Sequence, residues 1–155
     1  MSFEAVLAYF ASIGMADRVR HLEQSSATVE LAARAVGTAP CQIAKTMSFM
    51  LREGPILIVA AGDVRIDNKK FKAIFGQKAK MIPPAEVEAA IGHAPGGVCP
   101  FVTRPGVAVW LDESLKRFDV VYPAAGDDRS AVGLSPSELE RTSAARAWIN
   151  VCTES

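Results

Sequence analysis

Cysteine and histidine are scarce in this chain. Its 155 residues include three cysteines, Cys41, Cys99 and Cys152, and two histidines. The cysteines are widely spaced and form no CxxC pair, whereas a structural zinc site needs closely grouped thiolate and imidazole ligands. An odd number of cysteines is also a poor basis for a disulfide framework. We therefore expect reduced thiols, no metal site and no other cofactor.

Long apolar runs are also missing. No stretch approaches the roughly 20 apolar residues that cross a bilayer. The N-terminal segment MSFEAVLAYFASIGMADR interrupts its apolar positions with Glu4 and Ser12 at helical spacing, unlike a signal peptide. These absences predict a soluble, cytoplasmic protein with no membrane partner. With 50% hydrophobic and 22% charged residues, the chain has the size and composition of one domain, expected over residues 1–155.

Net charge is absent as well, because the formal charge at pH 7 is zero. A neutral chain has no global attraction to nucleic acid, and no DNA partner is expected. The charge is nevertheless unevenly distributed, with a net −1 over residues 1–40, +5 over 41–80 and −4 over 81–155. The positive segment RIDNKKFKAIFGQKAK contains Lys69, Lys70, Lys72, Lys78 and Lys80. These lysines form either a solvated helix face or a contact surface for phosphates.

Capping residues and breakers divide the chain into short elements. Helices are predicted over 3–13 with Ser2 as cap, 27–36 with Ser26, 69–75 with Asp67 or Asn68, 83–92, and 135–142 with Ser135. Strands are predicted at 42–51 and 56–61 as a hairpin, and then at KMI, VAVWLD, FDVVYPAA, SAVGL and RAWINV. This order predicts an α+β single domain, with a mixed, mostly antiparallel β-sheet or barrel and short surrounding helices.

The strand QIAKTMSFML contains an unexpected lysine. In a regular strand, Lys45 shares one face with the apolar residues Ile43, Met47, Phe49 and Leu51. Burying an unpaired ammonium group is costly, so either this face is open or the lysine meets an anion. Thr46 is expected to point to the opposite face, and a substrate role for it would require a β-bulge.

The segment PGGVCPF, residues 95–101, concentrates backbone constraints in one loop. Gly96 and Gly97 allow positive φ and a close approach of a ligand to the main chain, while prolines hold both flanks. Such a loop either presents N–H groups to an oxyanion or phosphate, or is simply a tight turn. Cys99 would need a base such as His93 to act as a nucleophile. We interpret Cys99 instead as a small wall residue of a pocket.

Five segments, in order, resemble the YbaK/prolyl-tRNA editing domain family: CQIAKTMSFML, AAGDVRIDNKKFKAIFG, GHAPGGVCPF, VWLDESL and AAGDDRSAVGLSPSELERTSAARAWI. The resemblance covers most of residues 27–150. Its most specific parts are Lys45-Thr46 and the glycine-x-x-x-proline loop. It implies a mixed α/β domain that hydrolyses the ester of mischarged aminoacyl-tRNA, mostly tRNA for proline carrying a small noncognate amino acid. The short chain resembles the free-standing members, with aminoacylated tRNA as substrate and prolyl-tRNA synthetase as a candidate partner.

The resemblance also implies roles for individual residues. Lys45 would face the aminoacylated end of the tRNA, and the loop residues Gly96, Gly97, Val98, Cys99 and Pro100 would hold the aminoacyl carbonyl while water or a ribose hydroxyl attacks. Candidate substrate-binding residues are Thr46, Met47, His93, Phe101, Lys69, Lys70 and Lys72. Two other functions remain open: a non-catalytic module that binds an aminoacyl or nucleotide end, and a hydrolase of another ester or thioester that uses Cys99.

Overall fold

A computed structural model describes residues 2–155 and has a four-stranded sheet at its centre, with the strand order β2-β3-β5-β7. These strands are Ala44–Leu51 (β2), Gly54–Ala61 (β3), Ala108–Asp112 (β5) and Trp148–Ile149 (β7). Two short antiparallel pairs accompany this sheet. They join Val19–His21 (β1) to Ser130–Val132 (β6), and Val64–Ile66 (β4) to Cys152–Glu154 (β8).

The predicted α+β fold with a mixed sheet is confirmed. The β2–β3 hairpin is antiparallel, as expected, and turns at Arg52 and Glu53. The pairs β3–β5 and β5–β7 are parallel, which the strand patterns did not indicate. A parallel pair requires a crossover connection, and the helical segment between β3 and β5 returns the chain to the same end of the sheet.

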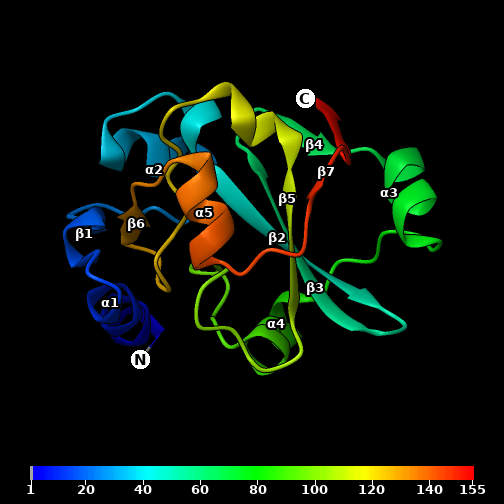
Figure 1. The fold of residues 1–155 in the computed structure, drawn as a ribbon, viewed down its shortest axis with the longest axis horizontal. Coiled ribbons are helices and arrows are strands. Elements are labelled where there is room, and N and C mark those ends of the chain that lie inside the picture. The colour runs from blue at the N-terminus through cyan, green and yellow to red at the C-terminus, as the bar shows by residue number, and fades with distance from the viewer. Residues whose placement is uncertain (1) are drawn as a thin grey trace.

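Helices surround the sheet (Figure 1). They are Ser2–Ser12 (α1), Val29–Val36 (α2), Asn68–Phe75 (α3), Pro84–Ile91 (α4) and Pro136–Thr142 (α5). Short 3₁₀ turns occur at Ala16–Arg18 (η1), Pro40–Gln42 (η2) and Glu113–Arg117 (η3). Figure 1 shows α1 and α3 at opposite ends of the long axis. Within residues 2–155, no helix is long and apolar enough to span a membrane.

Two of the predicted helix caps are confirmed and two are wrong. Asp67 accepts hydrogen bonds from the first backbone N–H groups of α3, and Ser135 forms a capping box at α5. Ser2 instead lies within α1, where its hydroxyl donates to the carbonyl of Gly92. Ser26 does not cap α2 either, because Thr28 holds that position and Ser26 is buried two residues earlier.

Two predicted strands are reduced to isolated bridges. The KMI segment pairs with the edge of β2 only through Met81 and Phe49, and FDVVYPAA contributes single bridges at Val121 and Tyr122. Pro83 follows KMI and Pro123 lies within FDVVYPAA, and proline has no N–H group to continue a ladder. These segments therefore border the sheet without adding a strand to it.

The hydrophobic core is centred on β3. Leu57, Ile58 and Val59 are each 0% exposed, and burial extends along the strand to Ala61. Because β3 has a neighbour on each side and is covered on both faces, it is continuously apolar rather than alternating. This buried strand gives its edge neighbour β2, which carries Lys45, a rigid support.

Candidate functional site

Lys45 is half-buried on β2 and its ammonium group has a protein partner. The Lys45 Nζ atom donates a hydrogen bond to the carbonyl of Val64 on β4. No carboxylate among residues 2–155 forms an ion pair with it. The backbone carbonyl thus satisfies one N–H without neutralising the charge. The positive charge therefore remains available to an anionic ligand.

A cavity of about 200 Å³ lies beside β2 and brings together motifs that are far apart in sequence. Lys45 and Thr46 line it from the strand, and Gly96 and Val98 line it from the loop. The remaining walls are mostly small or apolar: Ser26, Ala27, Thr28, Val29, Ala32, Ile43, Ala44, Tyr122, Ala124, Ser130 and Ala131. The cavity is therefore sized for a small group and has one cation at its wall.

The cavity lies along the edge of β2 that faces away from β3. This position explains why consecutive residues of the strand line it. The backbone N–H of Ala44 donates to Tyr122, and the carbonyl of Ser48 accepts from Ile82, both away from β3. Because antiparallel pairing alternates, Thr46 also directs its N–H and C=O to this edge. The register is continuous from Ala44 to Leu51, so the β-bulge proposed as a condition for Thr46 is absent and is not needed.

The hydroxyl of Thr46 adds an unusual feature to this edge. Its Oγ1 atom is buried and has no hydrogen-bond partner among the described residues. A buried hydroxyl without a partner is destabilising, and such groups are rare in folded proteins. At the wall of a cavity, it is a candidate contact for a polar ligand.

The glycine-rich loop turns successive residues to opposite sides. Gly96, with φ +90°, and Val98 face the cavity, whereas Gly97 is buried against Asp127. The N–H of Gly97 is used in a turn, because it donates to the carbonyl of Ala94 over 3.0 Å. The N–H groups of Gly96 and Val98 make no hydrogen bond within residues 2–155. These two donors are the ones that the loop can offer to an oxyanion.

Cys99 and His93 lie together in the core and outside the cavity. The Cys99 Sγ atom is 3.5 Å from His93 Nε2, which is itself 2.6 Å from the carbonyl of Phe101. That short contact places the proton on Nε2, which donates to the carbonyl and cannot accept the thiol proton. Burial raises the pKa of Cys99 to about 12 and lowers the pKa of His93, so both groups are neutral. Cys99 is therefore part of the core and not, as we interpreted it, a wall residue of the cavity.

Four other predicted site residues lie outside the cavity. Pro100 and Phe101 are buried, and the Phe101 ring packs 4.9 Å from that of Phe10. Met47 packs against the main core, and neither it nor His93 lines the cavity. The geometry thus assigns these residues to support of the loop and the strand.

One lysine of α3, Lys70, is connected to Lys45 through the β4–β8 strand pair. Lys70 Nζ donates to the carbonyl of Cys152 over 2.8 Å and to Asn150, and it is therefore tied to the protein. Cys152 belongs to the β4–β8 pair whose residue Val64 accepts the hydrogen bond from Lys45. Lys69 and Lys72 on the same helix are exposed. Lys70 thus lies one strand pair away from Lys45, and Lys69 and Lys72 form an exposed basic surface on the same helix.

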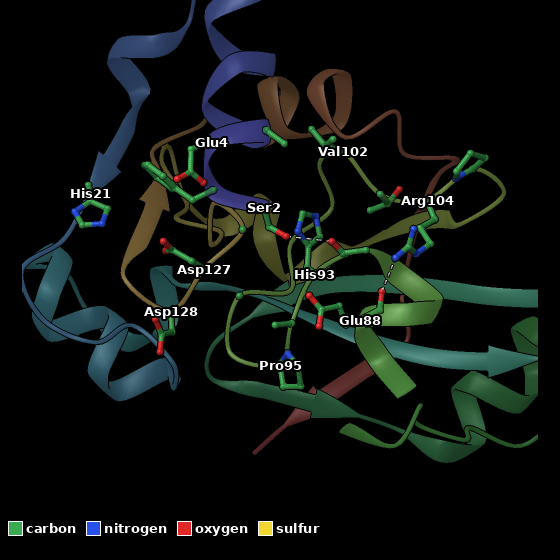
Figure 2. Close-up of a pocket in the computed structure, with 18 residues that line it drawn as sticks. Ser2, Glu4, His21, Glu88, His93, Pro95, Val102, Arg104, Asp127 and Asp128 are labelled. Atoms are coloured by element: carbon green, nitrogen blue, oxygen red, sulfur yellow. Dashed lines mark hydrogen bonds between the residues drawn. The ribbon is translucent and has the colours of Figure 1, made fainter. Parts of the chain in front are cut away.

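A larger groove of about 1020 Å³ lies on the other side of the loop (Figure 2). Its charged lining consists of one guanidinium, Arg104, and four carboxylates, those of Glu4, Glu88, Asp127 and Asp128. An acidic groove repels phosphates, whereas the smaller cavity contains Lys45. We therefore assign the candidate site for an anionic substrate to the smaller cavity.

Residues 23–142 match the family model described as the aminoacyl-tRNA editing domain. The chain belongs to this family. The uncharacterized protein YwhH of Bacillus subtilis (strain 168) is 47% identical to this editing domain over 156 residues, which cover 99% of each chain. The predicted resemblance is thereby confirmed.

Solved structures show the same fold. One, described as a candidate trans-editing enzyme for prolyl tRNA synthetase, is 29% identical and has a TM-score of 0.88, covering 98% of this chain and 97% of its own. Another, the hypothetical protein APE2540, is 25% identical with a TM-score of 0.85, covering 96% and 99% of the two chains. Family and fold together support deacylation of aminoacyl-tRNA as the reaction class and aminoacylated tRNA as the substrate class.

Sequence reasoning missed several polar residues at the cavity of this editing domain. The Ser26 hydroxyl donates to the Ser130 carbonyl over 3.3 Å and accepts from the Ser130 N–H over 3.1 Å. These bonds join residues 104 positions apart and bring Ser130 to the cavity wall. Tyr122 reaches the same wall through an irregular segment. No local pattern marks these residues, because each reaches the cavity through tertiary contacts.

Proposed function

We propose that this protein is a free-standing deacylase that removes a small noncognate amino acid from mischarged tRNA, with tRNA for proline as the first candidate. One observation carries the proposal. Lys45, Gly96 and Val98 line one cavity although about 50 residues separate the lysine from the loop, and the N–H groups of Gly96 and Val98 make no hydrogen bond within residues 2–155. The solved relative described in connection with prolyl tRNA synthetase makes that synthetase a candidate partner.

The proposed reaction relies on position rather than on a strong nucleophile. The ester carbonyl would lie against the loop, where Gly96 and Val98 donate hydrogen bonds to the oxygen as it becomes negative. Water then attacks the ester carbon, either directly or after the adjacent ribose hydroxyl has accepted the acyl group. The bond to the tRNA oxygen breaks, this oxygen takes up the proton that the water loses, and the amino acid leaves as a carboxylate. An aminoacyl ester is already activated, so orientation and oxyanion stabilisation can supply useful acceleration. Removal of one oxyanion donor typically costs about 3 kcal/mol, or about 100-fold in rate.

Cavity size supports a small amino acid. Drug-sized ligands occupy pockets of about 300 to 1,000 Å³, whereas this cavity measures about 200 Å³. Alanine residues at positions 27, 32, 44, 124 and 131 form much of its wall. A side chain of the size of alanine, serine or cysteine fits this volume better than a bulky one.

The charge around the site supports an approach of tRNA from α3. Lys45 would meet the terminal phosphate or the charge that develops on the ester. Lys69 and Lys72 would contact phosphates further along the backbone, while the acidic groove disfavours the opposite approach.

The proposal is tested with tRNA for proline charged separately with alanine, cysteine, serine, threonine and proline. We expect rapid loss of one noncognate ester, sparing of the prolyl ester, and a rate at least about 10-fold lower in Lys45→Ala because one cationic contact is lost. Lys116→Ala is the matched control, since Lys116 is an exposed lysine on η3 outside the cavity. Loss of every ester at the uncatalysed rate would contradict the proposal.

A second candidate function is a non-catalytic module that binds an aminoacyl or nucleotide end. It is favoured by the absence of histidine, aspartate and glutamate from the described lining of the cavity, which leaves no side-chain general base there. Binding of aminoacylated tRNA without hydrolysis in both wild type and Lys45→Ala would favour this function. The thioester alternative loses its support, because Cys99 is buried outside the cavity with its pKa raised to about 12.

A further inference from the structure

The site loop, which is the glycine-rich loop of residues 95–101, stacks with two other backbone segments without a side chain between them. A Cβ atom on Gly97 would lie 2.5 Å from the Cα of Asp127, and one on Gly126 would lie 2.7 Å from the carbonyl oxygen of Ser2 and 3.0 Å from the N of Phe3. Real Cβ atoms essentially never approach other atoms closer than 3.0 Å. The 126–127 peptide is therefore in contact with the loop on one side and with the start of α1 on the other.

Hydrogen bonds hold the base of the same loop. The Ser2 hydroxyl donates to the carbonyl of Gly92 over 3.1 Å, just before the loop begins. His93 Nε2 then donates a hydrogen bond across the base of the loop to the carbonyl of Phe101 over 2.6 Å. Figure 2 shows Ser2, His93 and Asp127 around the groove behind the loop. The first turn of α1 thus contacts the loop region directly and also through the 126–127 peptide.

We propose that Gly126 is a positioning residue for the site loop, and that it acts through Gly97 on the donors Gly96 and Val98. This inference rests on the proposed function, because it assigns the loop to oxyanion stabilisation. Gly126 does not itself line the 200 Å³ cavity, and the contacts that join it to the loop run through the backbone stack. Its φ of +101° and its contact with Ser2 both require glycine.

The chemical step is expected to be sensitive to this stack. Oxyanion donors act only when they lie about 2.7–3.1 Å from the developing charge, and a misplacement of about 1 Å can cost about 100-fold in rate. A methyl group at position 126 would displace either the start of α1 or the peptide that supports Gly97. Lys45 lies on β2, outside the stack, so kcat is expected to change more than KM.

The test compares Gly126→Ala with Gly106→Ala. Gly106 has a similar φ of +88°, but a Cβ there would meet nothing within 4 Å. Both variants carry the strain of a left-handed alanine, roughly 1–2 kcal/mol, and only Gly126→Ala adds the collision. We expect kcat to fall by about 30-fold or more in Gly126→Ala with KM changed less than about 3-fold, and both constants to stay within about 2-fold in Gly106→Ala.

A second measurement reports on the loop without using activity. Cys99 lies in the loop and is 0% exposed, while Cys152 is buried far from it in sequence at 6% exposure. Thiol labelling followed by mass spectrometry should show faster modification of Cys99 in Gly126→Ala and an unchanged rate at Cys152. Ser2→Ala, which removes the bond to Gly92 without a collision, should show a smaller change in the same direction and covers the case in which Gly126→Ala does not fold.

The outcomes separate this inference from the proposed function. If wild type deacylates no ester, the proposed function fails, and selective labelling of Cys99 still supports the role of the stack in holding the loop. A folded Gly126→Ala with wild-type kcat and wild-type labelling of Cys99 would overturn the inference. An equal rise in labelling at Cys99 and Cys152 would also overturn it, because that result indicates general loosening.

Discussion

The polar side chains of this editing domain differ in whether they already have a hydrogen-bond or ion-pair partner within the protein. Asp63 receives two hydrogen bonds from the Arg117 guanidinium, at 2.6 and 3.0 Å, which lower the pKa of its carboxyl. Lys45 has only a neutral carbonyl as its partner, and the Thr46 hydroxyl has none within the described part of the chain. Groups left incompletely satisfied beside a cavity are the ones that a ligand can complete.

Thr46→Val is expected to stabilise the protein and to slow deacylation. The substitution removes a buried hydroxyl without a partner, whose burial costs about 1–3 kcal/mol, and so we expect the free energy of unfolding to rise by about 1 kcal/mol. Urea unfolding and deacylation rates check the two parts. Thr142→Val is the matched control: its hydroxyl donates to the Glu138 carbonyl over 2.7 Å, and this variant should lose stability. A less stable Thr46→Val would contradict the prediction.

Cys99→Ala is expected to retain deacylation within about 3-fold, because the thiol is neutral and lies outside the cavity. A small cavity in the core should lower the free energy of unfolding by about 1–2 kcal/mol. Activity assays at matched folded fraction check this. Complete loss of activity in a folded variant would contradict the prediction and indicate that the Cys99 thiol takes part in the reaction.

At the scale of elements, α5 shows how a local motif and a distant contact combine. Ser135 and Glu138 form the capping box, and Glu138 Oε1 also accepts a hydrogen bond from Arg18 on η1 over 2.8 Å. The bond to Arg18 is the largest cause that lowers the pKa of Glu138 from 4.5 to about 2. The helix is thereby fastened to a segment 120 residues earlier in the chain.

Glu138→Gln should lower stability in a pH-dependent manner. The folded pKa of Glu138 is depressed, so its contribution is present above about pH 4.5 and is lost as the pH falls toward 2. Because Arg18 is 40% exposed, we expect a difference below about 1 kcal/mol at pH 7 that disappears near pH 2. Urea unfolding at several pH values checks it, with Glu113→Gln, from an exposed pair at 3.8 Å, as a control that should change little at any pH. A difference that persists at pH 2 would exclude the ionic origin.

At the scale of the whole molecule, opposite charges lie on different sides of the site loop. The net +5 of residues 41–80 includes Lys45 and the exposed lysines of α3, while the groove behind the loop has four carboxylates and one guanidinium. A polyanion is therefore attracted to one side and repelled from the other, although the net charge is zero.

Lys69→Ala combined with Lys72→Ala should raise KM for charged tRNA and leave kcat nearly unchanged. Each phosphate contact contributes roughly 0.7–0.9 to the slope of log affinity against log salt, so the double variant should reduce this slope by about 1 to 2. Deacylation measured over a range of salt concentrations checks it, with Lys116→Ala as the control. An unchanged slope would show that α3 does not contact the tRNA backbone.

Much of the local structure could be predicted because short-range physics decides it. The β2–β3 hairpin turns at a loop flanked by apolar runs, Asp67 caps α3 through the N–H groups of the next residues, and Gly76 and Gly92 end helices in the left-handed conformation. Lys45 and the glycine-rich loop were also identifiable, because a lysine in an apolar strand and two adjacent glycines conflict with ordinary packing. The family follows from these motifs in order.

Long-range contacts decided the remainder. Three features depend on residues more than 25 positions away or on the packing around them. They are whether Ser26 caps a helix or bonds Ser130, whether Cys99 faces the cavity or the core, and which of Gly96 and Gly97 faces the cavity. The parallel pairing of β5 likewise depends on how the helical crossover folds back. Such contacts leave no periodic signal in the chain, because loop closure brings together residues whose identities are locally unconstrained. The chain therefore specifies its elements and its family motifs locally, whereas the site that joins them exists only in the folded molecule.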